Sequence, residues 1–123
     1  MWPLRLSPRQ QQGQQGEQRA LAYLRGRGLA HIDSNFRCTC GEIDLIMRDG
    51  AQLVFVEVRQ RGDPSRGGAA ASINPAKMRR IVNAAHTYLQ RFPRPPPCRI
   101  DVVAIDGDKL EWLTNAVQAP GHA

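Results

Sequence analysis

The stretch Gly41–Arg61, GEIDLIMRDGAQLVFVEVRQR, decides the fold. Its middle, Asp49-Gly50, separates two runs rich in Ile, Leu, Val and Phe, and this dipeptide favours a two-residue hairpin turn because glycine accepts a positive φ. The pattern predicts antiparallel strands over residues 42–48 and 52–60. The second strand is apolar on both faces, which is typical of a strand inside a sheet that is covered on both sides.

The predicted register brings two carboxylates together. Asp44 then stands opposite Phe55 and diagonal to Glu57, roughly 7–8 Å away between backbones. Asp44, Glu57 and Arg59 project from one face, because side chains alternate along a strand. A solvated polar face would explain them without a function. An unpaired buried carboxylate is costly, however, so a partner is expected, and Mg²⁺ or Mn²⁺ suits two convergent carboxylates.

Composition places the chain among single-domain globular proteins. It has 123 residues, of which 41% are apolar, and this length suits one domain. No segment resembles a membrane span or a secretory signal, so no membrane association is expected. The three cysteines have poor spacing for zinc or for a disulfide set. Reduced thiols in the cytoplasm are therefore the expectation.

The net charge of +6 comes almost entirely from arginine. A basic domain suits nucleic acid or another anionic surface. Basic charge around a focal carboxylate cluster is the combination that a metal-dependent enzyme acting on phosphodiesters needs, because cations attract the backbone while carboxylates hold the activating ion. The composition therefore favours DNA as a partner.

The residues before the hairpin add a third acid. A helix is predicted from residue 14, and Glu17 falls on its inward stripe. Glu17 either joins a metal site or is a first-turn glutamate favoured by the helix dipole. A strand follows over residues 29–37, in which Asn35 and Arg37 share a face and either contact a phosphate or brace a loop.

The residues after the hairpin supply further basic groups. Residues 61–72, RGDPSRGGAAAS, predict an irregular flap over nucleic acid, with Arg61 and Arg66, or a simple connection. Asn74-Pro75 predicts a helix start, and the helix continues to about residue 92. Its first turns carry cations that contact a phosphate or form a solvated face, namely Lys77, Arg79 and Arg80.

The remaining pattern completes an α/β domain. Residues 99–105 predict a strand parallel to the Glu57 strand, because the preceding helix makes a crossover. A short strand is expected over residues 110–113. Asp101 is either a further acid of the cluster or the partner of a neighbouring arginine. The whole predicts a mixed β-sheet flanked by helices, with a core at about residues 13–113 and loose termini at 1–12 and 114–123.

Motifs along this core resemble the bacterial YraN family. They agree in order and spacing from about residue 13 to residue 113, and are Gly16-Glu17, Asn35-Phe36-Arg37, GEIDLI (41–46), VFVEV (54–58), Lys77 and RIDVV (99–103). That family is classed with restriction-endonuclease-like and Holliday-junction-resolvase-like nucleases. The resemblance implies a PD-(D/E)xK nuclease core that acts on DNA, including branched DNA, with a homodimer as one expected form.

The resemblance also implies roles for individual residues. Asp44 is similar to the central metal-binding aspartate, Glu57 to the acid of the D/E-x-K element, and Glu17 to the helix-borne glutamate of resolvase-like members. The carbonyl of Val58 is expected as a further ligand of Mg²⁺ or Mn²⁺. In such enzymes the metal activates a water for in-line attack on the phosphodiester.

One position departs from the family pattern. The lysine expected after Glu57-Val58 is Arg59. Arginine stabilises charge on a phosphate but does not lose its proton, so it cannot act as a base. Lys77 from the following helix is a candidate replacement, since such a migration occurs in this superfamily. Three hypotheses stay open: a nuclease, a nucleic-acid-binding module with impaired catalysis, and a role through protein partners alone.

Overall fold

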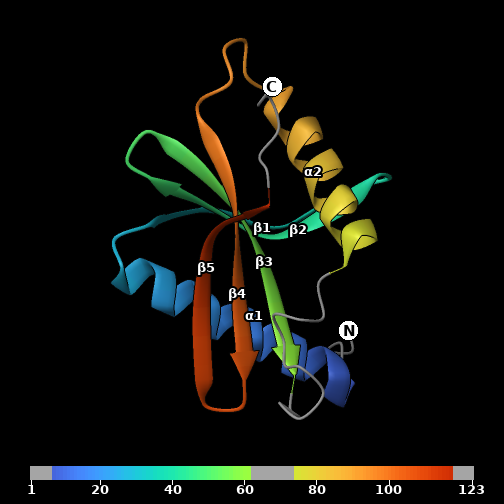
Figure 1. Ribbon diagram of the computed structural model, residues 1–123, viewed down its shortest axis with the longest axis vertical. Helices are drawn as coiled ribbons and strands as arrows, with labels where there is room; N and C mark the ends of the chain where they lie inside the picture. Colours follow the sequence, from blue (N-terminus) through green and yellow to red (C-terminus); the bar gives the residue numbers. More distant parts are fainter. Residues whose placement is uncertain (1–6, 62–73, 118–123) are drawn as a thin grey trace, which may run out of the picture.

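The computed structural model describes residues 7–61 and 74–117. Two α-helices and five strands follow one another along the chain (Figure 1), and their bounds are α1 (Pro8–Gly26), β1 (Ala30–Cys38), β2 (Gly41–Asp49), β3 (Gln52–Arg61), α2 (Pro75–Leu89), β4 (Cys98–Asp106) and β5 (Lys109–Val117). The strands form one sheet in the order β1-β2-β3-β4-β5. Strands β3 and β4 are parallel and the other neighbours antiparallel. The predicted α/β fold with a mixed sheet is confirmed, and it is consistent with a restriction-endonuclease-like core.

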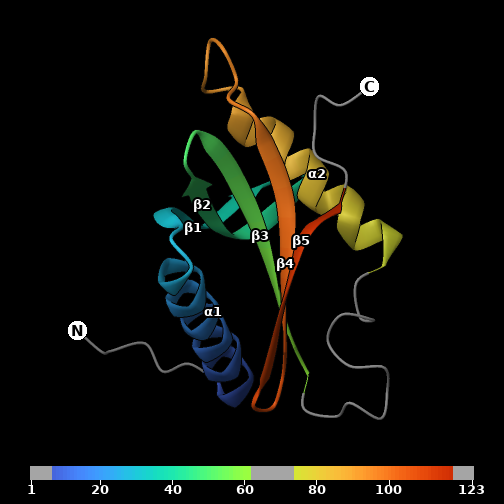
Figure 2. The same cartoon turned by 60° about the vertical axis from the view of Figure 1, so that its left-hand side comes forward.

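The two helices cover opposite faces of the sheet (Figure 2). Alternation along β3 separates the two cores: Phe55 lies in the core beneath α2, whereas Val54 and Val56 lie in the core beneath α1. Aromatic rings strengthen the α2 side, where Tyr88 makes edge contacts with Phe36 and Phe55 at 5.2 and 5.8 Å between centroids. The central strand is therefore buried on both faces, as its sequence predicts.

The hairpin forms, but its predicted turn is wrong. The turn residues are Gly50 and Ala51, so Asp49 pairs with Gln52 and Ile46 with Phe55. Gly50 has a φ of 61° and Ala51 a negative one, which suits a turn with glycine at its first central position. The register differs from the predicted one by two residues. A shift of two preserves the face of every side chain, so the predicted sharing of a face survives the error.

Both ends of the described chain are more regular than expected. Helix α1 begins at Pro8, not near residue 14; Ser7 precedes this proline, and its carbonyl accepts the Gln11 N–H at 2.9 Å, a favourable helix start. Strand β5 extends to Val117 instead of ending near residue 113. Residues 1–6 and 118–123 lie outside the described part, as does the predicted flap at 62–72 with Arg66.

Helix α2 begins where predicted. The side chain of Asn74 accepts the Lys77 N–H at 2.9 Å and Pro75 is the first helical residue. The helix ends at Leu89, three residues earlier than expected. Neither described helix is both long and apolar enough to cross a membrane. The three cysteines, Cys38, Cys40 and Cys98, are free thiols.

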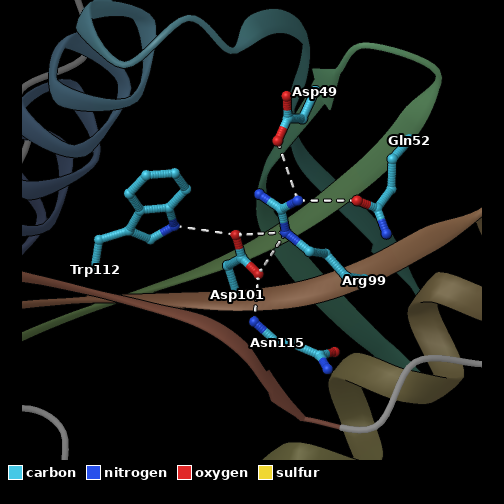
Figure 3. Close-up of polar contacts among 6 residues, drawn as sticks. All are labelled: Asp49, Gln52, Arg99, Asp101, Trp112 and Asn115. Carbon is cyan, nitrogen blue, oxygen red and sulfur yellow. Dashed lines mark hydrogen bonds and ion pairs between the residues drawn. The ribbon is translucent and has the colours of Figure 1, made fainter.

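Asp101 belongs to an ion-pair network and not to the acid cluster (Figure 3). Its side chain is 0% exposed and accepts hydrogen bonds from Arg99 Nε at 3.1 Å, Trp112 Nε1 at 3.0 Å and the Asn115 N–H at 2.7 Å. Arg99 also donates to the hairpin end, through Asp49 Oδ2 and Gln52 Oε1. This network ties the β2–β3 turn to β4 and β5, so the alternative of an arginine partner is the correct one.

Helix α2 and strand β2 approach closely at Gly41. A Cβ atom at this position would overlap the backbone carbonyl of Arg80, which cannot move without shifting the helix. Since α2 carries Lys77 on the same stretch, the spacing between this helix and β2 also sets how far Lys77 lies from the β2 carboxylates. Glycine is needed here for the approach of two backbones.

Replacing Gly41 by alanine should therefore destabilise the fold. We expect Gly41→Ala to lower the free energy of unfolding by about 1–3 kcal/mol, as overpacking of a closed interior does, measured by urea denaturation. Gly13→Ala is the matched control, because nothing lies within 4 Å of a Cβ at this exposed helical site; it should stabilise by roughly 0.5–1 kcal/mol. Equal effects of the two changes would contradict the close approach.

Removing the Asp101 carboxylate should be more damaging. Asp101→Ala leaves the partly buried Arg99 Nε and Trp112 Nε1 without this acceptor, and breaking a buried pair costs roughly 3–5 kcal/mol. We expect a lower urea midpoint with an unchanged slope. Asp108→Ala, in the exposed β4–β5 turn, should change the midpoint little. Near-native stability of Asp101→Ala would show that the network contributes nothing to the fold.

Candidate active site

Strand β2 separates from β3 at Asp44. Backbone pairing between these strands ends at Leu45 and Val56, and the next acceptor for β3 is a side chain: the Val58 N–H donates to Asp44 Oδ2 at 2.8 Å. In Figure 1 the beginning of β2 lies beneath α2, whereas the end of β3 continues beside β4. The carboxylate of Asp44 thus replaces a missing backbone carbonyl and lies at the point of separation.

Glu57 lies beside Asp44 in this gap. The two side chains are hydrogen-bonded to each other, and Glu57 is only 4% exposed. Burial, and next the negative charge of Asp44, raise the pKa of Glu57 to about 8. Burial also raises the pKa of Asp44, against the opposing hydrogen bond from Val58. The predicted convergence of the two acids is found, and without a cation they hold a proton between them at neutral pH.

Two cations flank the acids from different elements. Arg59 Nη1 lies 3.7 Å from Glu57 Oε1, with 17% of the arginine side chain exposed. Lys77 comes from the first turn of α2 and lines a pocket of about 220 Å³ together with Glu57, Arg80 and Glu42. The charges of Lys77 and Arg59 both act against the raised pKa of Glu57. Converging carboxylates with cations from two elements beside them suit the binding of a metal ion and a phosphate.

Glu17 approaches Asp44 from the α1 side. It is partly buried, and its pKa is raised by burial and then by the charge of Asp44, while a side-chain hydrogen bond from Asn35 lowers it. Among the described residues, no three His, Cys, Asp or Glu side chains are grouped closely enough to hold a metal ion. Glu17 is thus near Asp44 but does not complete a three-carboxylate cluster with it and Glu57.

The basic residues predicted to contact DNA are spread over two elements. Arg37, on β1, is exposed and pairs with Glu42 at 3.5 Å. Arg79 and Arg80 are exposed on α2, and Arg80 reaches the pocket that contains Glu57. The backbone of Arg61 ends β3; its side chain and all of Arg66 lie outside the described part. Contact of these residues with nucleic acid stays a prediction.

Glu42 is a member of the site that the sequence reasoning left out. It lines the pocket beside Glu57, and its charge contributes to the raised pKa of Asp44, after burial. The available signal was its position two residues before Asp44, which puts both acids on the stretch of β2 that separates from β3 while it stays paired with β1.

Comparison with known proteins identifies relatives for nearly the whole chain. Residues 16–105 match the model of "Uncharacterised protein family UPF0102". A UPF0102 protein of Herminiimonas arsenicoxydans is 57% identical over 111 residues, covering 90% of each chain. One from Janthinobacterium sp. (strain Marseille) is 54% identical over 120 residues, covering 95% of this chain and 98% of the relative. One from Cupriavidus taiwanensis is 59% identical over 113 residues, covering 90% and 86%.

The raised pKa of Glu57 predicts how stability depends on pH without metal. The unfolded carboxyl loses its proton near pH 4.5 and the folded one near pH 8. The folded state binds more protons between these values, so this group's contribution to stability falls as the pH rises from about 4.5 to 8. The free energy of unfolding of Glu57→Gln should therefore exceed that of the native chain by an amount that grows with pH, to roughly 2–4 kcal/mol by pH 8.5.

Thermal unfolding in a chelating buffer from pH 5 to pH 8.5 measures this gain. Glu111→Gln, at an exposed position on β5, is the matched control and should show a constant difference from the native chain. A difference for Glu57→Gln that is equally independent of pH would be incompatible with a buried proton at this site.

Proposed function

The chain belongs to the UPF0102 family, the YraN family that its motifs resemble, and we propose that it is a divalent-metal-dependent nuclease that cleaves DNA in the cytoplasm. The observation that carries this proposal is the contact between Asp44 and Glu57 in a buried gap flanked by Lys77 and Arg59. Two buried acids that face each other destabilise a fold. Such a destabilising arrangement favours a cationic ligand, because both carboxylates attract a cation although they repel each other.

The donor set fits Mg²⁺ or Mn²⁺. These ions prefer oxygen ligands, and Mg²⁺ is commonly held by one or two carboxylates with waters and substrate phosphates completing its shell. Asp44 and Glu57 would hold the ion, with the Val58 carbonyl expected beside them and Glu17 approaching from α1. The bound ion would supply an activated water and offset charge on the leaving oxygen.

The cations of this chain act on the phosphate. Arg59 offers a planar fork of donors but no removable proton, so its role is to bind and stabilise charge. Lys77 extends from a helix start that Asn74 caps. From this position on α2, it takes the role of the family lysine beside Glu57. The proposal therefore assigns charge stabilisation to Arg59 and the orientation of the attacking water to Lys77.

The substrate is DNA, with branched or otherwise structured DNA as the preferred form. Arg80, which lines the pocket, and Arg37, which pairs with the pocket residue Glu42, would contact phosphates of separate strands, together with Arg61, Arg66 and Arg79. A junction with two equivalent strands suits two copies of the chain, so we include a homodimer in the proposal. Phosphate contacts of this kind make affinity fall with rising salt.

A specific observation favours a second candidate, a nucleic-acid-binding module without cleavage. Arg59 already pairs with Glu57 at 3.7 Å, and in this module that pair would neutralise the acid without a metal. The module would gain affinity for DNA when an acid is removed. The enzyme would lose its activity upon the same change.

Cleavage of junction, flap and linear DNA in Mg²⁺ or Mn²⁺ separates the two functions. We expect the native chain to cut and Asp44→Asn to lose at least about 100-fold in rate, since the missing ligand removes metal-assisted stabilisation of charge. Lys77→Ala should lose about 10- to 1,000-fold in rate. Arg59→Lys should retain cleavage. A native chain that cuts no substrate, with tighter DNA binding by Asp44→Asn, would favour the binding module and refute the nuclease.

The chain offers matched controls for each change. Asp108→Asn alters an exposed residue of the β4–β5 turn and Lys109→Ala the exposed first residue of β5, and Lys109 is the second of two lysines in the sequence. Both variants should cut at the native rate. Mn²⁺ should raise the melting temperature of the native chain and of these controls but not that of Asp44→Asn, which tests metal binding without a cleavage assay. Full cleavage by Lys77→Ala would exclude the lysine from the reaction.

A further inference from the structure

Asn35 has an unusual backbone for a strand residue. Its φ is 55°, and among the described residues only Asn115 is another non-glycine with positive φ. Asparagine tolerates this left-handed conformation better than most residues, but it still costs free energy. Such conformations persist where the surrounding structure requires them, and they are frequent at functional sites.

The strained residue stands across from Asp44. Strands β1 and β2 pair at Ser34–Leu45 and again at Phe36–Ile43, with no pair between Asn35 and Asp44. On β2 the core changes at this point: Leu45 packs beneath α1, whereas Ile43 packs beneath α2. Side chains two residues apart normally share a face. The unpaired position thus lets side chains on either side of it, in β1 and in β2, point to opposite faces of the sheet. The left-handed backbone of Asn35 makes this possible in β1.

The side chain of Asn35 has its own partner in the site. Asn35 hydrogen-bonds to the carboxylate of Glu17 on α1, and both residues line a pocket of about 150 Å³ between α1 and β1. Neighbouring Gly16 is buried and lies against the Gln60 side chain on β3. The backbone beside Glu17 therefore packs against the sheet, and the Asn35 amide restrains the Glu17 side chain.

We infer that Asn35 is a positioning residue, which holds the Glu17 carboxylate toward the Asp44 end of the metal site instead of contacting a DNA phosphate. This inference rests on the proposed metal-dependent function. A glutamate has several rotatable bonds, and one hydrogen bond from a fixed strand residue limits the orientations that it samples. Partners of metal ligands commonly change metal affinity or activity about 10- to 100-fold when they are removed.

The two roles of Asn35, backbone and amide, can be separated by substitution. Asn35→Gly keeps the left-handed backbone accessible and removes only the amide. Asn115→Gly is the matched control, because it makes the same change at the other left-handed asparagine, whose backbone N–H, and not its side chain, donates to Asp101. We expect Asn35→Gly to weaken Mn²⁺ binding about 10- to 100-fold and Asn115→Gly to leave Mn²⁺ binding unchanged. Electron paramagnetic resonance of the free ion measures the affinity.

Coupling to Glu17 is the decisive measurement. If Asn35 acts through Glu17, Asn35→Gly should change Mn²⁺ affinity and kcat less than about 2-fold in a Glu17→Gln background, where the carboxylate is already absent. Independent losses that multiply in the double variant would overturn the inference. A loss confined to KM for DNA would overturn it as well, and would return Asn35 to the role of a phosphate contact.

Failure of the inference is distinguishable from failure of the proposed function. If the native chain neither binds Mn²⁺ nor cuts DNA, the nuclease proposal fails, and the positioning role is then decided by NMR on the metal-free chain. Nuclear Overhauser effects between the Asn35 amide protons and the Glu17 methylenes should be present, and Asn35→Gly should disorder the Glu17 side chain. Their absence, or an unchanged Glu17, would overturn the positioning role.

Discussion

The Val58 amide needs an acceptor at the point where the backbone of β2 has left β3, and the Asp44 carboxylate provides it at 2.8 Å. Much of the site follows from this substitution. A backbone carbonyl would have continued the ladder and closed the gap in which Glu57 lies. Because a side chain takes its place, the two strands diverge, and each helix covers one side of the opening. Asp44, which takes the place of the missing backbone carbonyl, is therefore also the acid that residues of both α1 and α2 approach.

The chain contains two kinds of buried acid, and the contrast separates structure from function. Asp101 is surrounded by donors from Arg99, Trp112 and Asn115, so its charge is balanced by the fold itself. Glu57 instead faces Asp44, and its pKa is raised to about 8 by burial and then by that neighbour. Packing alone favours removal of one such acid. A requirement for a ligand gives a physical reason for keeping both.

Sequence patterns predicted most of the fold because local signals and burial agreed. Apolar runs on both sides of Asp49-Gly50 predicted the hairpin, and the cap at Asn74 predicted α2. The turn was misplaced because Gly50 can occupy either central position, and local sequence does not choose between them. The predicted convergence of Asp44 and Glu57 survived because side-chain faces repeat every two residues. The separation of β2 from β3 depends on tertiary packing and left no local signal.

Formal charges indicate what the site is built to receive. Ionised Asp44 and Glu57 carry two negative charges, which a divalent cation neutralises, and Lys77 and Arg59 then leave two positive charges beside Glu57. Attack on a phosphodiester increases the negative charge on its oxygens, so cations fixed beforehand stabilise the transition state more than the substrate. Arg59 on β3 and Lys77 on α2 approach Glu57 from separate elements. An arginine in the strand is therefore compatible with catalysis as long as the helix supplies the lysine.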